Sequence, residues 1–198
     1  ITIHPRPDER HIKYSDAYDL KENITTELNI EGNPSQKFIN MVCKVKPEQV
    51  TLVPDKDDAI TSNSGWDTIN NFDFLNDVVN EFQLNSIRVS IFVDPDYKMV
   101  EGAKKINADR VELFTGPYAK QYLNDKNNAI NKYVKCAEAA NKIGIELNAG
   151  HDLNQENLEF FKNNIVNLKE VSIGHALISE SLYFGLESTI KSYLKILN

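Results

Sequence analysis

Glycine, cysteine and long apolar runs are all scarce in this sequence. The chain of 198 residues holds eight glycines and two cysteines. No stretch approaches the roughly 20 consecutive apolar residues that a membrane-spanning helix needs. Neither a GxGxxG motif nor a P-loop occurs, so the glycine-rich phosphate loop of nucleotide-binding sheets is missing. We therefore expect no membrane partner and no open, doubly wound nucleotide-binding domain.

Metal-binding spacings and an excess of basic charge are missing as well. Cys43 and Cys136 match no zinc-binding or CxxC spacing, so we expect two reduced packing residues in a cytoplasmic protein. No HxH or HExxH pattern occurs, and we expect no metal site. The net charge is 22 − 29 = −7, which argues against a nucleic-acid partner. With 41% hydrophobic and 26% charged residues, the composition is that of a folded globular protein.

Short apolar runs alternate with helical patterns from one end of the chain to the other. The apolar spacing within residues 130–140 predicts a helix that ends at Gly144. Helix starts are predicted at residues 34–35 and 152–154, and an apolar stripe over 182–197 predicts a C-terminal helix. The predicted strands, rich in Val, Ile and Leu, are Ile1–His4, Glu27–Gly32, Gln49–Pro54, Ile87–Asp94, Arg110–Thr115, Ile145–Gly150 and Glu170–Ala176.

Seven strands that are each followed by a helix predict a parallel sheet. Because the doubly wound alternative lacks its glycine-rich loop, we expect an α/β fold, a single (β/α)8 TIM-barrel domain over residues 1–198. Such barrels usually need about 250 residues. The chain also opens inside a predicted strand, at Ile1-Thr2-Ile3, without an initiator Met. We therefore expect the natural protein to begin earlier, and the first strand and helix of the barrel to be missing from this chain.

All four histidines of the chain lie at or beyond predicted strand ends. His4 and His11 come with the first strand, His151 after the sixth and His175 near the end of the seventh. In a (β/α)8 barrel the active site is built at these ends, so we expect the histidines to act on a substrate. The alternative for any single one is a loop or capping histidine with a structural role only.

Two glutamates are predicted to point into the barrel. Glu31 shares one face of its strand with Asn29, while its apolar neighbours share the other face. Glu112 lies within the fifth strand. A carboxylate at the mouth of a barrel needs partners or a raised pKa, which makes each glutamate a candidate general base. The alternative is a buried ion pair with a neighbouring lysine or arginine.

Cationic and backbone groups near the same strand ends suit phosphate. Arg6 can bind a phosphate through two parallel N–H donors, and His11 lies in the same loop. Gly174 precedes a helix start, where backbone N–H groups commonly bind phosphate in barrels. The polar segment 54–65 is a candidate lid, with an ordinary surface loop as the alternative.

Seven short motifs stand in order along the chain. They are HPRPDERH (His4–His11), LNIEGNP (Leu28–Pro34), VTLVPD (Val50–Asp55), TSNSGWD (Thr61–Asp67), RVELFTGPYA (Arg110–Ala119), LNAGHDLN (Leu147–Asn154) and VSIGHAL (Val171–Leu177). Each motif alone is short, but the ordered set covers essentially the whole chain and is specific. It resembles the pyridoxine 5′-phosphate synthase family.

The resemblance implies a (β/α)8 barrel with extra helices that assembles into a homo-octamer built from dimers. It implies condensation of 3-amino-2-oxopropyl phosphate with 1-deoxy-D-xylulose 5-phosphate to pyridoxine 5′-phosphate, phosphate and water, without a metal or organic cofactor. The implied acid/base groups are His4 and Glu31, the proton donor is His151, and the transition-state stabiliser is Glu112. The implied contacts to deoxyxylulose phosphate are Arg6, His11 and Ser62, and those to aminooxopropyl phosphate are Gly174 and His175. The N–H of Asp152 is a further implied phosphate contact.

The chain departs from the family pattern at three places. Ser62 stands where the family usually has Thr, and Asp152 stands where Gly is common. We expect the carboxylate of Asp152 to point away from the phosphate and to cap a helix beginning near Leu153. The Asn-x-Asp motif of the family's first strand, with the Arg that follows it, has no counterpart here.

Two other functions stay open on the sequence alone. One is a non-catalytic barrel that binds phosphorylated metabolites. The other is a different cofactor-free lyase or aldolase. A Schiff-base aldolase needs an interior lysine at a strand end, and no predicted strand end carries one.

Overall fold

Seven parallel strands form one sheet in the computed structural model, which describes residues 1–55 and 61–198. They pair in chain order: β1 (Thr2–Ile3), β2 (Asn29–Gly32), β3 (Gln49–Leu52), β4 (Arg88–Val93), β5 (Arg110–Phe114), β6 (Glu146–Gly150) and β7 (Leu168–Ser172). The helices are α1 (Tyr14–Asn23), α2 (Gln36–Val45), α3 (Phe72–Leu84), α4 (Tyr97–Lys105), α5 (Gly116–Ile143), α6 (Leu158–Asn164), α7 (His175–Phe184) and α8 (Leu186–Leu197).

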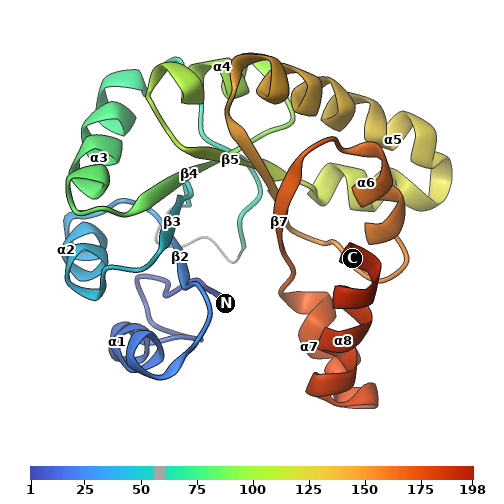
Figure 1. Cartoon of the computed structure of the whole chain (residues 1–198), viewed down its shortest axis with the longest axis horizontal. Helices are drawn as coiled ribbons and strands as arrows, with labels where there is room; N and C mark the ends of the chain where they lie inside the picture. The colour runs from blue at the N-terminus through green and yellow to red at the C-terminus, as the bar shows by residue number, and fades with distance from the viewer. Residues whose placement is uncertain (56–60) are drawn as a thin grey trace.

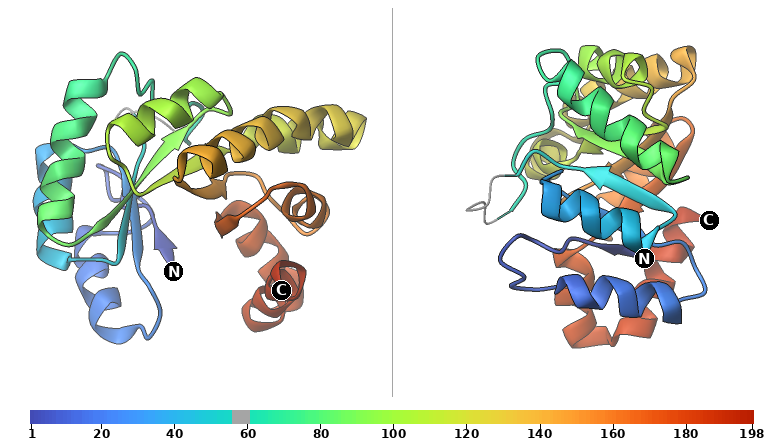
Figure 2. Two further views of the ribbon diagram at one scale, coloured as in Figure 1. Left: turned by 45° about the horizontal axis from the view of Figure 1, so that its top comes forward. Right: turned by 90° about the vertical axis from the view of Figure 1, so that its left-hand side faces the viewer.

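The sheet curls like a horseshoe, with the helices on its outer side (Figure 1). In the described part of the chain β1 pairs only with β2 and β7 only with β6, so the ring of strands is open. In Figure 1, α1 and the pair α7–α8 stand on opposite sides of this opening. Figure 2 shows that α5 projects beyond its neighbours. The architecture is that of a (β/α)8 barrel without one strand and helix, as the sequence predicts.

The alternation along β2 separates an apolar outer face from a polar inner one. Leu28, just before the strand, and Ile30 are fully buried in the core between sheet and helices. The side chain of Asn29 instead donates a hydrogen bond to Thr2 on β1 and accepts one from Thr51 on β3. Because side chains alternate along a strand, Glu31 shares this inner face, as predicted.

Two helix ends carry the predicted residues. Ser35 caps α2, and its Oγ accepts a hydrogen bond from the backbone N–H of Phe38. Gly144 ends α5 with φ 68°, a left-handed conformation that glycine adopts at no steric cost. These local signals place α2 and the end of α5 without help from tertiary packing.

Two other predicted boundaries are wrong. The seventh strand ends at Ser172 rather than Ala176, because Gly174 and His175 begin α7. No helix begins near Leu153. The side chain of Asn154 accepts hydrogen bonds from two backbone N–H groups, which forms a turn first, and α6 starts only at Leu158.

The predicted C-terminal helix over residues 182–197 is two helices. Gly185, with φ 78°, separates α7 from α8, so Leu182 belongs to α7. α7 has no fully buried residue, and several apolar side chains of α7 and α8 are exposed beside the opening of the barrel: Ile178, Leu182, Tyr183, Phe184, Leu186 and Leu194. The apolar stripe therefore predicts helical structure correctly, but its side chains do not face the core along its whole length.

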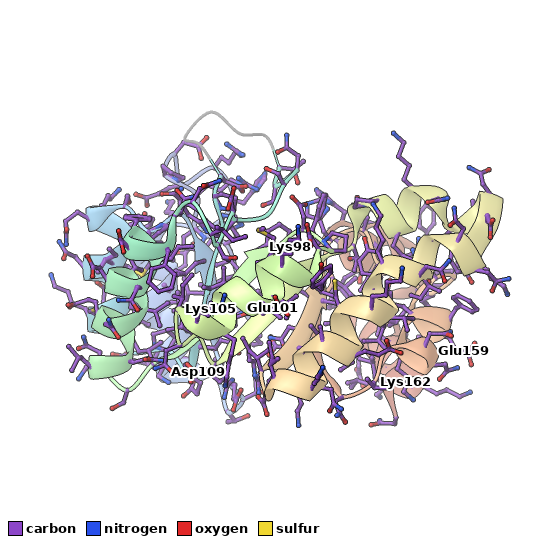
Figure 3. All side chains as sticks on the ribbon, turned by 90° about the horizontal axis from the view of Figure 1, so that it is seen from above. Lys98, Glu101, Lys105, Asp109, Glu159 and Lys162 are labelled. Carbon is purple, nitrogen blue, oxygen red and sulfur yellow. The ribbon has the colours of Figure 1, made fainter. Side chains whose placement is uncertain are left out.

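The outer surface is rich in charged side chains. Lys98, Glu101 and Lys105 lie exposed on α4 (Figure 3). Among the described helices, none is long and apolar enough to cross a membrane. Cys43 and Cys136 are both free thiols, as expected, and the second is buried.

Candidate active site

The polar ends of the strands bring most predicted site residues to one edge of the sheet. His4 follows β1 directly, His151 follows β6, and His175 is the first residue of α7 after β7. His11 lies further along the loop after β1 and is exposed. The prediction that the histidines gather at strand ends is thus confirmed for three, while His11 stands apart on the loop.

His4 and Glu31 form the centre of this edge. The Nδ1 atom of His4 lies 3.7 Å from Oε2 of Glu31. Burial, helped by the nearby Arg6 guanidinium, lowers the pKa of His4 from 6.5 to about 4. Burial raises the pKa of Glu31 from 4.5 to about 7. Between about pH 4 and pH 7 both groups are therefore uncharged, and the proton of the pair sits on the glutamate.

Glu112 lies deeper inside the barrel on β5. Its side chain is buried, and burial together with the charges of Glu31 and Glu170 raises its pKa well above 4.5. Space for its carboxyl group comes from Gly150 on the neighbouring strand, because a Cβ there would lie 2.0 Å from Glu112 Oε1. Within the described residues, neither Glu112 nor Glu31 forms an ion pair with a lysine or arginine, so the buried ion-pair alternative is wrong.

Below Glu112, on the inner face of β7, Glu170 is held by a polar network. Arg110 donates a hydrogen bond to Glu170 at 3.0 Å, and Asn148 donates another at 3.4 Å. Gln49 donates to both carboxylate oxygens. This network fixes a negative charge below the site, which opposes ionisation of the carboxyl groups above it.

A second cluster surrounds Arg6 in the loop after β1. Its Nη1 donates a hydrogen bond at 3.0 Å to Asp55 Oδ2, just after β3. Ser62 donates to the same oxygen at 2.6 Å. The predicted substrate residues Arg6 and Ser62 thus meet through a carboxylate. Of the candidate lid over 54–65, residues 56–60 lie outside the described residues.

The ring of His151 is contacted on three sides. Its Nε2 lies 2.9 Å from the hydroxyl oxygen of Thr61, and its Nδ1 lies 3.3 Å from Oδ2 of Asp152. The ring of Phe114 meets it edge-on, with centroids 5.2 Å apart. The predicted capping role of Asp152 is therefore wrong: its carboxylate turns back toward His151 instead of toward a helix start.

A cavity of about 850 Å³ opens beside His151 between the starts of α5 and α7. Its lining includes Gly116, Lys120, Asp152 and His175. A hollow of about 390 Å³ between α3 and α4 lies on the outer side of the barrel and holds none of the predicted site residues. Among the residues that the structure describes, no group of three or more His, Cys, Asp or Glu is arranged to hold a metal ion.

Sequence reasoning missed Thr61, Asp55 and Glu170. Thr61 and Ser62 are adjacent hydroxyl residues, and the sequence offered no ground for choosing between them. Asp55 directly follows the Pro that ends the third predicted strand, which is the same position that singled out the histidines. Glu170 opens a predicted strand, far from its end, so only the curl of the sheet shows that it lies beneath Glu112.

Comparison with known proteins identifies the family of this chain. The chain matches the family described as "Pyridoxal phosphate biosynthesis protein PdxJ" over residues 1–198. It is 60% identical over 195 residues to pyridoxine 5′-phosphate synthase of Flavobacterium johnsoniae, covering 98% of this chain and 82% of the relative. The corresponding Porphyromonas gingivalis protein is 52% identical over 193 residues, with 98% and 81% covered.

Solved structures confirm the barrel architecture at low sequence identity. A 3-keto-L-gulonate-6-phosphate decarboxylase from Vibrio cholerae superimposes with a TM-score of 0.65 at 10% identity, covering 98% of this chain and 84% of the other. A thiamine phosphate pyrophosphorylase from Pyrococcus furiosus gives 0.62 at 12% identity, with 100% and 84% covered. These likenesses show the fold alone. The match along the whole sequence shows more: this chain belongs to the PdxJ family of pyridoxal phosphate biosynthesis proteins.

Proposed function

We propose that this chain catalyses the condensation of 3-amino-2-oxopropyl phosphate with 1-deoxy-D-xylulose 5-phosphate to pyridoxine 5′-phosphate, phosphate and water. Family membership supports the reaction. The observation that carries it is the His4–Glu31 pair, whose shifted pKa values leave a neutral imidazole beside a carboxyl group that titrates near pH 7. Ring closure moves protons at several steps, which needs groups able to give and take them near neutral pH.

Glu31 and His4 share the acid and base work in this proposal. The carboxylate form of Glu31 takes a proton from the substrate, and the protonated form returns one later. Neutral His4 accepts a proton while Glu31 is already protonated. The pKa values of about 7 for Glu31 and about 4 for His4 prevent a permanent ion pair, which leaves both groups available to the substrate.

Glu112 and His151 supply hydrogen-bond and proton donors. Burial raises the pKa of Glu112 well above 4.5 and so favours its protonated form, which in this proposal donates a hydrogen bond to an oxygen that gains negative charge in the transition state. His151 donates a proton to the departing group. Glu112 is buried inside the barrel, where the low local dielectric strengthens such a contact.

Two phosphate sites hold the substrates in register. Arg6, His11 and Ser62 bind deoxyxylulose phosphate, and the start of α7 at Gly174 and His175 binds the aminooxopropyl phosphate together with the N–H of Asp152. The cavity beside α5 and α7 supports the second site. Holding both phosphates replaces the entropy loss of a bimolecular encounter.

The setting of the reaction is part of the proposal. We expect a single-domain homo-octamer built from dimers in the cytoplasm. It needs no metal or organic cofactor and has neither a nucleic-acid nor a membrane partner. The acidic net charge of −7 supports the absence of these two partners, because it repels nucleic acids and anionic membrane surfaces.

The test is turnover by the purified protein. With both substrates present, mass spectrometry detects pyridoxine 5′-phosphate and a colorimetric assay detects phosphate, while Glu31→Gln gives neither at a comparable rate. If the parent protein binds each substrate by calorimetry yet forms no product, the protein is a binding barrel and the proposal is wrong.

A further inference from the structure

The carboxylate of Asp152 lies beside the ring of His151, the proposed proton donor. Its Oδ2 lies 3.3 Å from Nδ1 of His151, an ion-pair contact. Nδ1 is buried, and among the described residues it has no aligned hydrogen bond. Asp152 itself is half exposed, with 48% of its side chain open to solvent, so one oxygen reaches the ring from the cavity side.

The backbone holds Asp152 in this orientation. His151 and Asp152 both have positive φ, at 90° and 58°, a rare conformation for residues with side chains. Thr115 maintains it by donating its hydroxyl to the carbonyls of Gly150 and His151. Asn157 donates to the carbonyl of Asp152. Aspartate tolerates the left-handed region, and here that region turns its carboxylate back onto the preceding residue.

We propose that Asp152 is a positioning residue, which keeps a proton on Nδ1 of His151 and so directs Nε2 to the substrate. A carboxylate only accepts hydrogen bonds, so the neutral ring must carry its hydrogen on Nδ1. Nε2 then accepts from Thr61 in the resting state. In the charged ring Nε2 carries the proton that passes to the leaving oxygen, the N–H bond breaks as the O–H bond forms, and the ring returns to the Nδ1–H tautomer.

This inference rests on the proposed function for the role of His151, but the contact itself is tested without turnover. Nitrogen-15 NMR of ring-labelled histidine reports which ring nitrogen carries hydrogen. We expect the Nδ1–H form of His151 in the parent protein at high pH. In Asp152→Gly we expect the Nε2–H form or a mixture, because the acceptor at Nδ1 is gone.

Turnover supplies the second readout. Asp152→Gly is expected to lower kcat about 10- to 100-fold, the loss that follows when the hydrogen-bond partner orienting a metal-bound histidine is removed. KM for either substrate should stay within twofold to threefold. Asp152→Asn, which keeps an acceptor oxygen and tolerates positive φ, should restore the Nδ1–H form and recover part of kcat.

The matched control is Ser86→Gly. Ser86 is exposed, has φ 62° and lies before β4 at the opposite end of the barrel. Its replacement by Gly therefore relieves a similar left-handed backbone conformation far from the site. It should change neither kcat nor the His151 spectrum. An unchanged tautomer in Asp152→Gly, or a loss confined to KM for aminooxopropyl phosphate, would overturn the inference. A parent protein without synthase activity would instead overturn the proposed function, and the spectrum would still decide on Asp152.

Discussion

His4 and Glu31 stand 3.7 Å apart with the proton on the partner that normally loses it first. The pKa of the glutamate, about 7, lies above that of the histidine, about 4. Between these values both groups are uncharged, and neither holds the other in a salt bridge. Such a reversal costs stability and is typical of sites where acid/base chemistry is done.

Replacing Glu31 by Gln should abolish most turnover while preserving the binding of both substrates. Loss of a general base typically slows a reaction 10²- to 10⁴-fold. Steady-state kinetics gives the rate, and calorimetry with each substrate alone gives the affinities. A rate within threefold of the parent would remove Glu31 from the mechanism.

The same substitution should stabilise the protein at alkaline pH. The folded-state pKa of Glu31 is raised, so its contribution to stability is fully present below about pH 4.5 and is lost as pH rises through about 7. Gln cannot ionise and escapes this loss. His4 acts in the opposite sense, losing stability as pH falls from 6.5 toward 4, but it does so in both proteins.

The advantage of Glu31→Gln in unfolding free energy should therefore grow by roughly 2–3 kcal/mol between pH 5 and pH 8, since one pKa unit corresponds to about 1.4 kcal/mol. Urea unfolding at the two pH values measures it. A constant difference would mean that Glu31 ionises normally in the folded protein.

Arg6→Ala should weaken deoxyxylulose phosphate binding selectively. A charge-assisted contact is worth about 1.5–3 kcal/mol, or roughly 10- to 150-fold in affinity. Arg10→Ala is the control, because Arg10 lies in the same loop and pairs with Asp8 on the surface. Calorimetry should show a loss of affinity only for deoxyxylulose phosphate and only in Arg6→Ala. Equal losses of affinity for both substrates would reject the assignment.

Gly150→Ala should disturb Glu112 more than it disturbs the fold. The added Cβ would lie 2.0 Å from the carboxyl oxygen, which is the movable end of a side chain. We expect a change in stability within about 1 kcal/mol and a fall in kcat of about 100-fold, because displacement of a catalytic group by about 1 Å costs that much. Gly102→Ala, which meets Thr68 outside the barrel, should alter stability without altering kcat.

Thr61→Val and Ser62→Ala should distinguish the roles of the two adjacent hydroxyl groups. Thr61 contacts His151, so its loss should lower kcat by about 5- to 12-fold, the equivalent of one hydrogen bond of about 1–1.5 kcal/mol. Ser62 contacts Asp55 beside Arg6, so its loss should raise KM for deoxyxylulose phosphate. The reverse pattern would show that the two hydroxyls have been assigned to the wrong roles.

Local patterns in the sequence determined the parallel βα order, the inward face of Glu31 and the placing of three histidines at strand ends. Strand alternation depends only on neighbouring residues, and strand ends in a barrel meet at one edge whatever the details of packing. The same is true of Ser35 as a cap and Gly144 as a helix end.

Tertiary structure alone decided the partners of these groups. The reversed pKa order of His4 and Glu31 comes from burial, which no local pattern measures. The sequence predicts Asp152 to be a helix cap because Asp before an apolar run usually is one, but its positive φ, held by the hydroxyl of Thr115 just after β5, aims it at His151. Contacts between side chains of different strands depend on the curl of the whole sheet, so local sequence patterns do not predict them.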